Sequence, residues 1–339
     1  MNLNLGMVGC GDIAGYTAFF ARLSRNIAMT ACCDVSQERA DKFAGRHGIK
    51  HVYTDYAVML ANAKLDAVYL AVPHNLHYEM IEQAISAGKH IFVEKPIALD
   101  RRGAQAAIRF AEEAGIALAV GFNRRFHPSI RELKTRVQSG RLGVIATIMA
   151  ELTATGAFYR STNSWRLDPL EEPAGAMAAI GVHLVDGMID IIGRIREVYC
   201  VARQRAGPHG DDTTSLLLNF ENGVTGHVFC SSAAARNFRM AVYGGKGFAE
   251  VLTPTMDVFR FIPAVEGRAS HLARIPDAEE IATPGFNSVT EELAQFARCI
   301  IERRPYPVPL DEVLHGVCVF EAAVESARIK RPVMVSDAA

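Results

Sequence analysis

The sequence has no long apolar run that is free of charged residues. The strongest candidate for a membrane span, Ala174 to Gly193, contains His183, Asp186 and Asp190, and each of these side chains is costly to place in lipid. The pattern of a secretory signal, a basic segment followed by an apolar stretch, is also missing before the first predicted strand. We therefore expect a cytoplasmic protein that does not associate with a membrane.

Paired cysteines and excess charge are lacking as well. The seven cysteines show no C-x-x-C spacing, which favours reduced thiols over a disulfide framework. The adjacent Cys32 and Cys33 are best explained as small residues of a buried strand, with a redox role as the alternative. The formal net charge of −1 argues against nucleic acid as a partner.

The histidines form no convincing metal-binding pattern. His74 and His77 have an i, i+3 spacing, yet neither a cysteine nor an obvious third ligand lies nearby in the sequence. His47 and His51 are separated by Gly48 and are expected to be solvated residues beside a turn. The sequence therefore predicts no metal site.

What the sequence does contain is enough apolar material for two domains, because half of its 339 residues are hydrophobic. In residues 1–122, segments with the pattern of strands (3–8, 28–33, 65–72, 90–93 and 116–120) alternate with helical segments (13–24, 74–87 and 101–114). This alternation predicts a doubly wound parallel sheet with right-handed crossovers. Residues 123–339 have a different pattern and are expected to form a second domain.

The first strand leads into a glycine-rich turn, Gly9-Cys10-Gly11-Asp12-Ile13-Ala14. Gly9 and Gly11 permit a tight bend and a close approach of a pyrophosphate to the backbone, and Ala14 lets the next helix pack on the strand. The first amides of that helix, at the positive end of its dipole, are suited to phosphates. The turn therefore predicts a dinucleotide site.

Asp34 ends the second strand, about 20 residues after the glycine turn, where an acid that binds the ribose hydroxyls is expected. A carboxylate there repels a 2′-phosphate, which favours NAD over NADP. The alternative for Asp34 is a cap on the helix that begins at Ser36.

Glu94-Lys95-Pro96 follows the apolar strand 90–93 and places an acid and an amine at its carboxyl end. Ligands of open parallel sheets bind at this edge, and Pro96 keeps Lys95 out of helical dihedrals. Lys95 is therefore a candidate for the cofactor cleft. An ion pair with Glu94 or another acid is the alternative.

The second domain is predicted to be α+β, with a mainly antiparallel open sheet. Strand-like segments occur at 144–152, 198–202, 213–220, 223–231 and 238–243, and Glu221-Asn222-Gly223 is typical of a hairpin turn. Such a sheet can leave one face open for a substrate or a second subunit. Helices are expected at 128–139, 174–192, 287–303 and 310–327, and the last of them is expected to return to the first domain.

Taken together, these residues resemble the Gfo/Idh/MocA family of glucose-fructose oxidoreductase and inositol dehydrogenase, over nearly the whole chain. The resemblance lies in the glycine turn and in six further motifs. These are Ala71-Val72-Pro73-His74-Asn75 with His77, Glu94-Lys95-Pro96, Gly121-Phe122-Asn123-Arg124-Arg125-Phe126, Trp165-Arg166, Gly181-Val182-His183 and a carboxyl-terminal helix that ends near Ser326.

The resemblance implies that Lys95 lies beside the nicotinamide and that His183 is the acid/base residue, although His183 could instead be a satisfied core histidine. The expected cofactor-binding residues are Gly9, Gly11, Asp12, Ile13, Ala14, Asp34, Val72, Pro73, Asn75, His77, Glu94 and Lys95. The expected substrate-binding residues are Lys95, Arg124, Tyr159, Trp165, Arg166 and His183. For Arg124, Tyr159, Trp165 and Arg166, packing or surface roles are equally open.

One position departs from the family pattern. The helix with His183 typically also carries an aspartate one turn earlier, and here that position is Ala179. The missing carboxylate would normally bind substrate and help set the tautomer and pKa of the imidazole. Asp186 could orient His183 from the other side, or it could face solvent or the core.

These features predict an oxidoreductase that uses NAD, with NADP less favoured, on a sugar, polyol or cyclic alcohol. The resemblance implies a homo-oligomer, a dimer or tetramer, formed through the open sheet face. Ala179 supports one alternative, a non-catalytic protein of the same fold that senses NAD or a sugar. A further alternative is a reductase or dehydrogenase for a cyclic diene-diol or keto sugar, for which Ala179 makes room.

Overall fold

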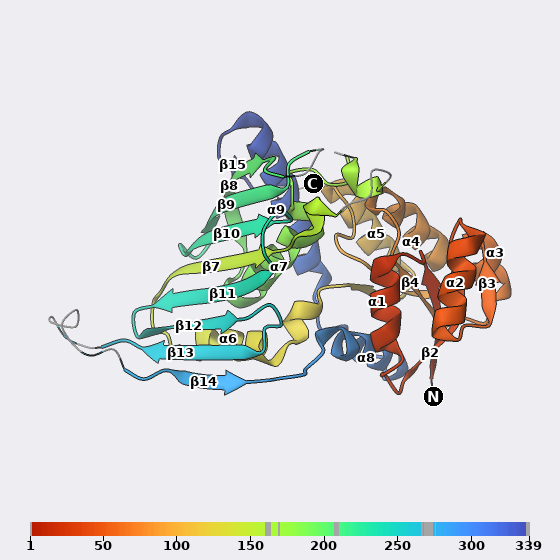
Figure 1. The fold of residues 1–339 in the computed structure, drawn as a ribbon, viewed down its shortest axis with the longest axis horizontal. Coiled ribbons are helices and arrows are strands. Elements are labelled where there is room, and N and C mark those ends of the chain that lie inside the picture. Colours follow the sequence, from red (N-terminus) through yellow and green to blue (C-terminus); the bar gives the residue numbers. More distant parts are fainter. Residues whose placement is uncertain are drawn as a thin grey trace. The chain divides into compact units, whose positions relative to one another are not determined.

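The computed structural model describes residues 2–336 except 160–163, 169, 207–209, 266, 268–273 and 275. The chain forms two compact units, which are described here one at a time (Figure 1). The first contains residues 1–123 and 287–317, and the second contains residues 124–286 and 318–339. In the described part of the chain, no helix is long and apolar enough to cross a membrane.

The first unit is built on a six-stranded parallel sheet with the order β3-β2-β1-β4-β5-β6. This order is that of a dinucleotide-binding sheet, whose direction of winding reverses between β1 and β4. Its strands are β1 (Leu3–Val8), β2 (Ile27–Cys33), β3 (His51–Tyr53), β4 (Ala67–Leu70), β5 (His90–Val93) and β6 (Leu118–Val120).

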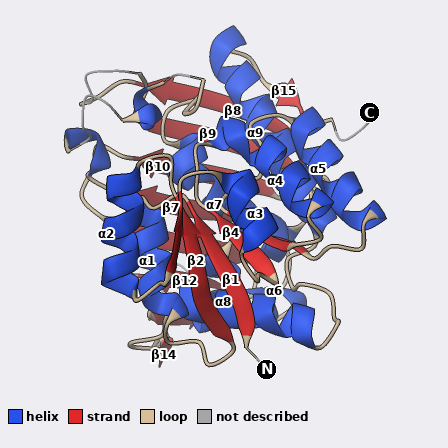
Figure 2. Cartoon of the chain, turned by 90° about the vertical axis from the view of Figure 1, so that its right-hand side faces the viewer, coloured by secondary structure: helices blue, strands red, loops and turns tan. Residues whose placement is uncertain are grey.

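Helices cover both faces of this sheet, with α1 and α2 on one side and α4 and α5 on the other (Figure 2). Small residues let α1 lie close to the strands, since Ala14, Ala18 and Ala21 are fully buried. The helices are α1 (Asp12–Ala21), α2 (Gln37–His47), α3 (Tyr56–Asn62), α4 (His77–Ser86), α5 (Arg101–Glu113) and α8 (Ser288–Ile301), followed by the start of α9 (Leu310–Ile329).

Helix α8 joins this core from far along the sequence. The ring of Phe296 on α8 meets that of Phe92 on β5 edge to face, with 5.4 Å between the centroids. Leu293 and Ala297 of the same helix are also fully buried in the core cluster. Such aromatic contacts add to the hydrophobic burial that fixes the helix.

The second unit contains a nine-stranded sheet with the order β14-β13-β12-β11-β7-β10-β9-β8-β15. The pairing of β10 with β7 is parallel and the other pairings are antiparallel, so the sheet is mixed but mostly antiparallel. Its strands are β7 (Ile145–Thr153), β8 (Ile195–Arg203), β9 (Thr213–Phe220), β10 (Thr225–Ser231), β11 (Asn237–Gly244), β12 (Gly247–Leu252), β13 (Val258–Pro263), β14 (Glu279–Ala282) and β15 (Val333–Met334). The predicted fold class is thus confirmed for both parts of the chain.

Helices α6 (Pro128–Gln138) and α7 (Val182–Ile192) pack on one face of this sheet. Alternate residues of β9 point to the two faces: Leu216 and Leu218 are buried, whereas Leu217 is 43 % exposed. Phe229 of the neighbouring strand is 38 % exposed. The second face of the sheet therefore presents apolar side chains to solvent in this chain.

Two local expectations were wrong. The helix expected over Ala174 to Ile192 is α-helical only from Val182, because Ala174 and Gly175 adopt the left-handed conformation (φ 55° and 69°) and interrupt it. Met177–Gly181 then forms a π-helical turn.

His47, expected in solvent, is 9 % exposed in the last turn of α2. Its ring lies 4.6 Å from that of Phe43. The glycine after it ends the helix but leaves the imidazole on the buried side.

Candidate active site

The glycine bend after β1 allows a backbone approach that only glycine permits. Gly9 has φ +82°, and a Cβ atom at this position would lie 2.4 Å from the carbonyl oxygen of Ala71 at the end of β4. Any side chain would therefore clash with backbone. The bend brings the ends of β1 and β4 together at the point where the sheet order reverses, which is where such folds bind ligands.

Helix α1 begins at this bend with an open amino terminus. Gly11 is its N-cap residue, and no side chain caps it within the described residues. The amides of Asp12, Ile13 and Ala14 occupy the first turn, where backbone N–H groups lack acceptors within the helix. This uncapped turn and the glycine bend fit the pyrophosphate of a dinucleotide.

Asp34 lies directly beside the bend. Its Oδ2 accepts the backbone N–H of Cys10 at 2.9 Å, and its Oδ1 accepts the N–H of Ser36 at 2.9 Å. The guanidinium of Arg39 also contacts Oδ1, at 3.0 Å. The helix cap predicted as an alternative is provided by Ser36, whose Oγ accepts the N–H of Arg39. Asp34 thus joins the bend to the start of α2, and its Oδ2, which accepts one printed bond, has a lone pair left for a ribose hydroxyl.

A hydrogen-bonded chain that sequence reasoning missed fixes the end of β5. The buried hydroxyl of Tyr69 on β4 donates to Oε1 of Glu94 at 2.5 Å and lies 2.9 Å from the hydroxyl of Thr17 on α1. Burial and the neighbouring carboxylate raise the pKa of Tyr69 well above its ordinary value. A tyrosine inside a fully apolar strand is the available signal, since its hydroxyl needs a partner.

Lys95 follows Glu94 and is 8 % exposed, so this lysine is largely buried at the carboxyl end of β5. The neighbouring segment is held by His77, which is fully buried. The His77 ring nitrogens lie 2.9 Å from the carbonyl oxygen of Pro96 and 3.1 Å from that of Val72. The imidazole therefore lies between the residues after β4 and those after β5, and in its neutral form it donates to one of the two carbonyl oxygens. Burial lowers its pKa to about 4 despite these two acceptors.

We expect His77 to make folding stability depend on pH. Between its ordinary pKa of 6.5 and its folded value of about 4, the unfolded chain binds a proton that the folded protein does not. Stability contributed by neutral His77 is therefore lost as the pH falls through this window, by about 2 kcal/mol between pH 7 and pH 5. Urea unfolding at the two pH values measures the loss.

His77→Asn should be less stable at pH 7 and should show a smaller loss on acidification. The matched control is His51→Asn, at an exposed position, which should keep the wild-type dependence. Equal pH dependence in His77→Asn and the wild type would contradict the assignment.

The other predicted residues of this edge lie on the segment after β4. Val72 and Pro73 are half-buried and Asn75 is exposed, in the short 3₁₀ turn before α4. His74 and His77 stack edge to face at 5.6 Å between ring centroids. No cluster of His, Cys, Asp or Glu in the described residues could hold a metal ion.

In the second unit, His183 lies in the first turn of α7, directly after the π-helical turn that contains Ala179. The turn packs tightly on β10: a Cβ atom at Gly181 would lie 2.5 Å from Sδ of Met177 and 3.0 Å from Sγ of Cys230. Widened helical turns of this kind occur often at functional sites.

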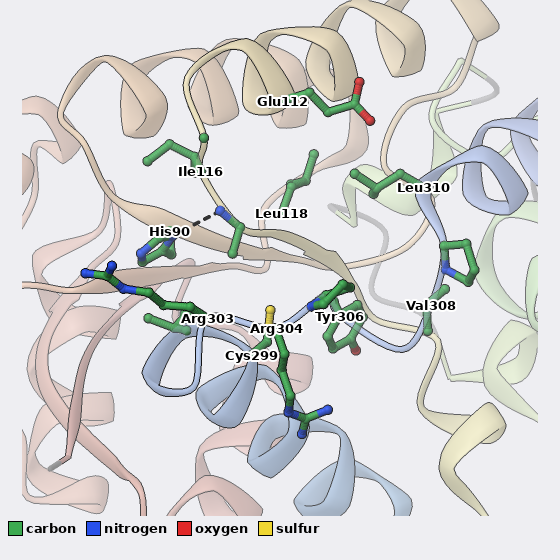
Figure 3. Close-up of a pocket in the computed structure, with 15 residues that line it drawn as sticks. His90, Glu112, Ile116, Leu118, Cys299, Arg303, Arg304, Tyr306, Val308 and Leu310 are labelled. Atoms are coloured by element: carbon green, nitrogen blue, oxygen red, sulfur yellow. Dashed lines mark hydrogen bonds between the residues drawn. The ribbon is translucent and has the colours of Figure 1, made fainter.

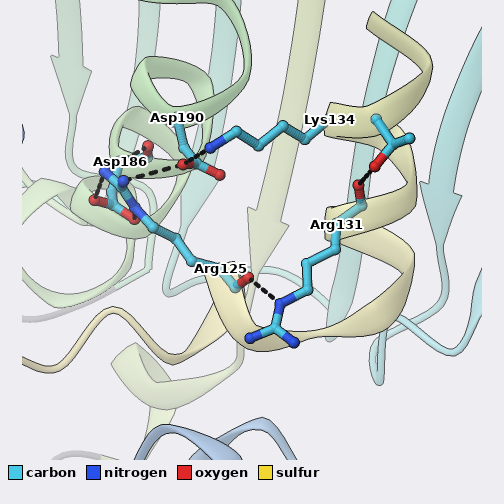
Figure 4. Close-up of polar contacts among 6 residues, drawn as sticks. Arg125, Arg131, Lys134, Asp186 and Asp190 are labelled. Carbon is cyan, nitrogen blue, oxygen red and sulfur yellow. Dashed lines mark hydrogen bonds and ion pairs between the residues drawn. The ribbon is translucent and has the colours of Figure 1, made fainter. Parts of the chain in front are cut away.

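Helix α7 is anchored by an ion-pair network that the sequence did not predict (Figure 4). Arg125 makes two bonds to Asp186, from Nε at 2.9 Å and from Nη2 at 2.6 Å, and a third to Asp190 at 3.1 Å. Lys134 on α6 also donates to Asp190, at 2.6 Å. Arg125 and Asp186 are buried. Asp186 therefore faces the core and binds Arg125.

Two acids four residues apart on an apolar helix are the signal for this network, because buried carboxylates require a cation.

The remaining candidates also lie in the second unit. Arg124 donates to Sδ of Met256 at 3.5 Å and lies over the ring of Phe238. The Arg166 guanidinium lies 4.3 Å from the ring centre of Trp165 and pairs with the buried Glu172 at 2.5 Å.

Tyr159 is 82 % exposed. It is the one exposed residue of these four predicted substrate contacts, since Arg124, Trp165 and Arg166 are half-buried. The contact of all four with substrate remains a prediction.

Comparison with known proteins agrees with this architecture. The chain is 28 % identical over 344 residues to inositol 2-dehydrogenase of Rhizobium meliloti, covering 99 % of this chain and 100 % of that protein. It is 26 % identical over 343 residues to the uncharacterized oxidoreductase YrbE of Bacillus subtilis, covering 97 % and 96 %. A structure of levoglucosan dehydrogenase in complex with NADH has the same fold, with a TM-score of 0.89 at 21 % identity and full coverage of both chains.

Family models match both parts of the sequence. Residues 3–122 match the oxidoreductase family with an NAD-binding Rossmann fold, and residues 130–250 match the C-terminal domain of the same family. The chain therefore belongs to the Gfo/Idh/MocA family of NAD-binding oxidoreductases.

Proposed function

We propose that this protein is a dehydrogenase that uses NAD to oxidise, or in reverse to form, a CH–OH carbon of a sugar, polyol or cyclic alcohol. The observation that carries the proposal is Lys95, a largely buried lysine at the carboxyl end of β5. It shares this edge of the sheet with the glycine bend and Asp34. Family membership supports oxidoreductase chemistry, and the inositol and levoglucosan dehydrogenases support the substrate class.

The proposed cofactor site lies along the carboxyl edge of the parallel sheet in the first unit. The amides of Gly11 to Ala14 would hold the pyrophosphate and Asp34 the adenosine ribose, while Gly9 keeps the approach open. Val72, Pro73, Asn75, His77 and Glu94 would line the cleft or support it. NAD is favoured over NADP because the carboxylate of Asp34 would repel a 2′-phosphate.

In the proposed reaction, NAD supplies the two-electron acceptor when it is bound. Lys95 would donate a hydrogen bond to the reacting oxygen and stabilise negative charge as the hydroxyl loses its proton. His183 would accept that proton. Arg124, Tyr159, Trp165 and Arg166 would bind the other hydroxyls of the substrate. Residues 1–122 would thus bind the cofactor. Residues 123–339 would bind the substrate and form the oligomer contacts.

We also infer a homo-oligomer that forms through the open face of the second unit's sheet. Leu217 and Phe229 are exposed there on neighbouring strands. Apolar side chains gathered on one open sheet face mark an interaction surface.

The function is tested by following NADH formation with NAD and a panel of inositols, sugars and cyclic diols. Saturable NADH formation with at least one of them is expected. Ala179, in place of the family aspartate, favours the alternative of a sensor without catalysis. Tight NAD binding with no turnover across the panel in either direction would support that alternative and overturn the dehydrogenase.

Asp34 gives a prediction about cofactor choice. Asp34→Asn should raise the preference for NADP over NAD, measured as the ratio of kcat/KM, on the order of 10- to 100-fold, because like-charge repulsion costs several kcal/mol. Asp34→Asn also releases Arg39, which could then pair with a 2′-phosphate. In the double variant Asp34→Asn/Arg39→Ala the part of the gain that comes from removing the Asp34 charge should remain, and only the part that comes from Arg39 should disappear. If the ratio of kcat/KM for NADP over NAD is unchanged in Asp34→Asn, Asp34 does not bind the ribose.

A further inference from the structure

A cavity lies in the first unit at the edge of the parallel sheet opposite the proposed dinucleotide site (Figure 3). Its volume is about 740 Å³, within the range of small-molecule sites. His90 and Leu118, the first residues of β5 and β6, line it. It therefore opens at the amino ends of these strands, whereas the proposed dinucleotide site lies at the carboxyl ends. The two sites are separated by the length of the strands.

The walls of this cavity are mixed, with apolar side chains beside polar and charged ones. Ile116 and Leu118 come from the connection into β6, and Val308 and Leu310 come from the segment after α8 (Figure 3). Leu118 and Val308 are almost fully buried. These side chains suit the hydrocarbon or ring portion of a ligand.

His90 provides a defined hydrogen-bond donor to the cavity. Its Nδ1 accepts the backbone N–H of Ala117 at 3.0 Å. Because an amide can only donate, Nδ1 carries no proton, and the neutral ring holds its proton on Nε2. Burial lowers the pKa of His90, which keeps the ring neutral at pH 7. The imidazole thus offers one fixed N–H.

Arg303 provides a positive charge at the same wall. Figure 3 shows its side chain extending toward His90. It is exposed, and among the described residues its guanidinium makes no ion pair or hydrogen bond. The adjacent Arg304 differs, because Glu302 and Gln295 both bind it. Glu112 places a carboxylate elsewhere on the lining (Figure 3).

We propose that this cavity binds a small monocarboxylate with an apolar body, separately from the dinucleotide and its substrate. Arg303 and the Nε2–H of His90 would hold the carboxylate, and Ile116, Leu118 and Val308 would contact the body. Among the described residues that line the cavity, one cation without an ion pair and one neutral donor match a single negative charge. Glu112 disfavours a second anionic group on the ligand. This proposal does not depend on the reaction proposed above.

The test is calorimetric titration of the full chain with phenylacetate, in the presence of saturating NADH, with neutral phenylacetamide as the comparison ligand. We expect saturable phenylacetate binding and at least about tenfold weaker binding of phenylacetamide, because a charge-assisted hydrogen bond is lost. No saturable binding of phenylacetate, or its displacement by NADH, would overturn the proposal.

Variants locate the binding site. Arg303 has φ 53° as the residue that follows the C-cap of α8, a position at which glycine is unstrained. Arg303→Gly should therefore fold at least as stably as the wild type while binding phenylacetate at least about tenfold more weakly. Lys330→Gly is the matched control, since Lys330 follows α9 with φ 59° and does not line the cavity. Equal affinity of Arg303→Gly and wild type would also overturn the proposal.

Discussion

Replacing Lys95 by alanine is expected to lower kcat by about 10²- to 10⁴-fold while NAD binding is retained, the range typical of a lost proton-transfer or charge-stabilising group. His183→Ala should show a loss of the same size. Lys95 is the one cation of the motif after β5, and it is largely buried. Its removal would therefore leave the developing oxyanion without its nearest positive charge. Steady-state kinetics and calorimetric NAD titration separate the two effects.

The controls address folding and specificity. Lys95→Met keeps most of the side-chain volume without the charge and should lose as much activity as Lys95→Ala. Lys89→Ala is the matched lysine control: Lys89 precedes the same strand at its other end, where it donates to the carbonyl oxygen of Leu65, and activity should be unchanged. Full activity in both Lys95→Ala and His183→Ala would defeat the catalytic assignment.

Replacing Arg125 by methionine is expected to destabilise the second unit by about 3–5 kcal/mol, because it leaves a buried acid without its cation. Arg125 makes three of the bonds that hold Asp186 and Asp190. The side chains of Arg125 and Asp186 are both about 95 % buried. Since α7 also carries His183, loss of the network should reduce activity along with stability. Urea unfolding measures the first effect.

Lys134→Met tests the outer part of the same network. The Lys134 side chain is 33 % exposed, so its loss should cost only about 0–1 kcal/mol. The double variant Arg125→Met/Asp186→Leu removes both buried charges and should recover much of the loss of Arg125→Met. Arg125→Met with wild-type stability would show that the network does not hold α7.

Much of the first unit could be predicted because its signals are local. The glycine bend requires a residue that tolerates positive φ and a bare Cα, so Gly9 could be assigned from the sequence alone. Asp34 was predicted as a ribose-binding residue from its spacing to the glycine turn. The alternation of strand and helix patterns predicted the parallel sheet. The bond from the backbone N–H of Cys10 to Asp34 could not be foreseen, because it depends on how β1 and β2 lie side by side.

The second unit was harder to predict because its decisive contacts join distant segments. The pairing of Arg125 with Asp186 spans 61 residues, and no periodicity encodes it. The parallel pairing of β10 with β7 and the later strands β12 to β14 also lacked a local signal. The π-helical turn before His183 depends on the left-handed residues Ala174 and Gly175.

By itself, the sequence determined the family and the winding of the amino-terminal sheet, and it predicted the glycine bend after β1, since backbone conformation and hydrophobic period act over a few neighbours. Tertiary structure alone decided that Tyr69 holds Glu94, that Asp186 is neutralised by Arg125, and that Arg303 and His90 share a cavity. The physical reason is that buried polar and charged groups must find partners. Which partner each one finds depends on the packing of elements that lie far apart in the chain.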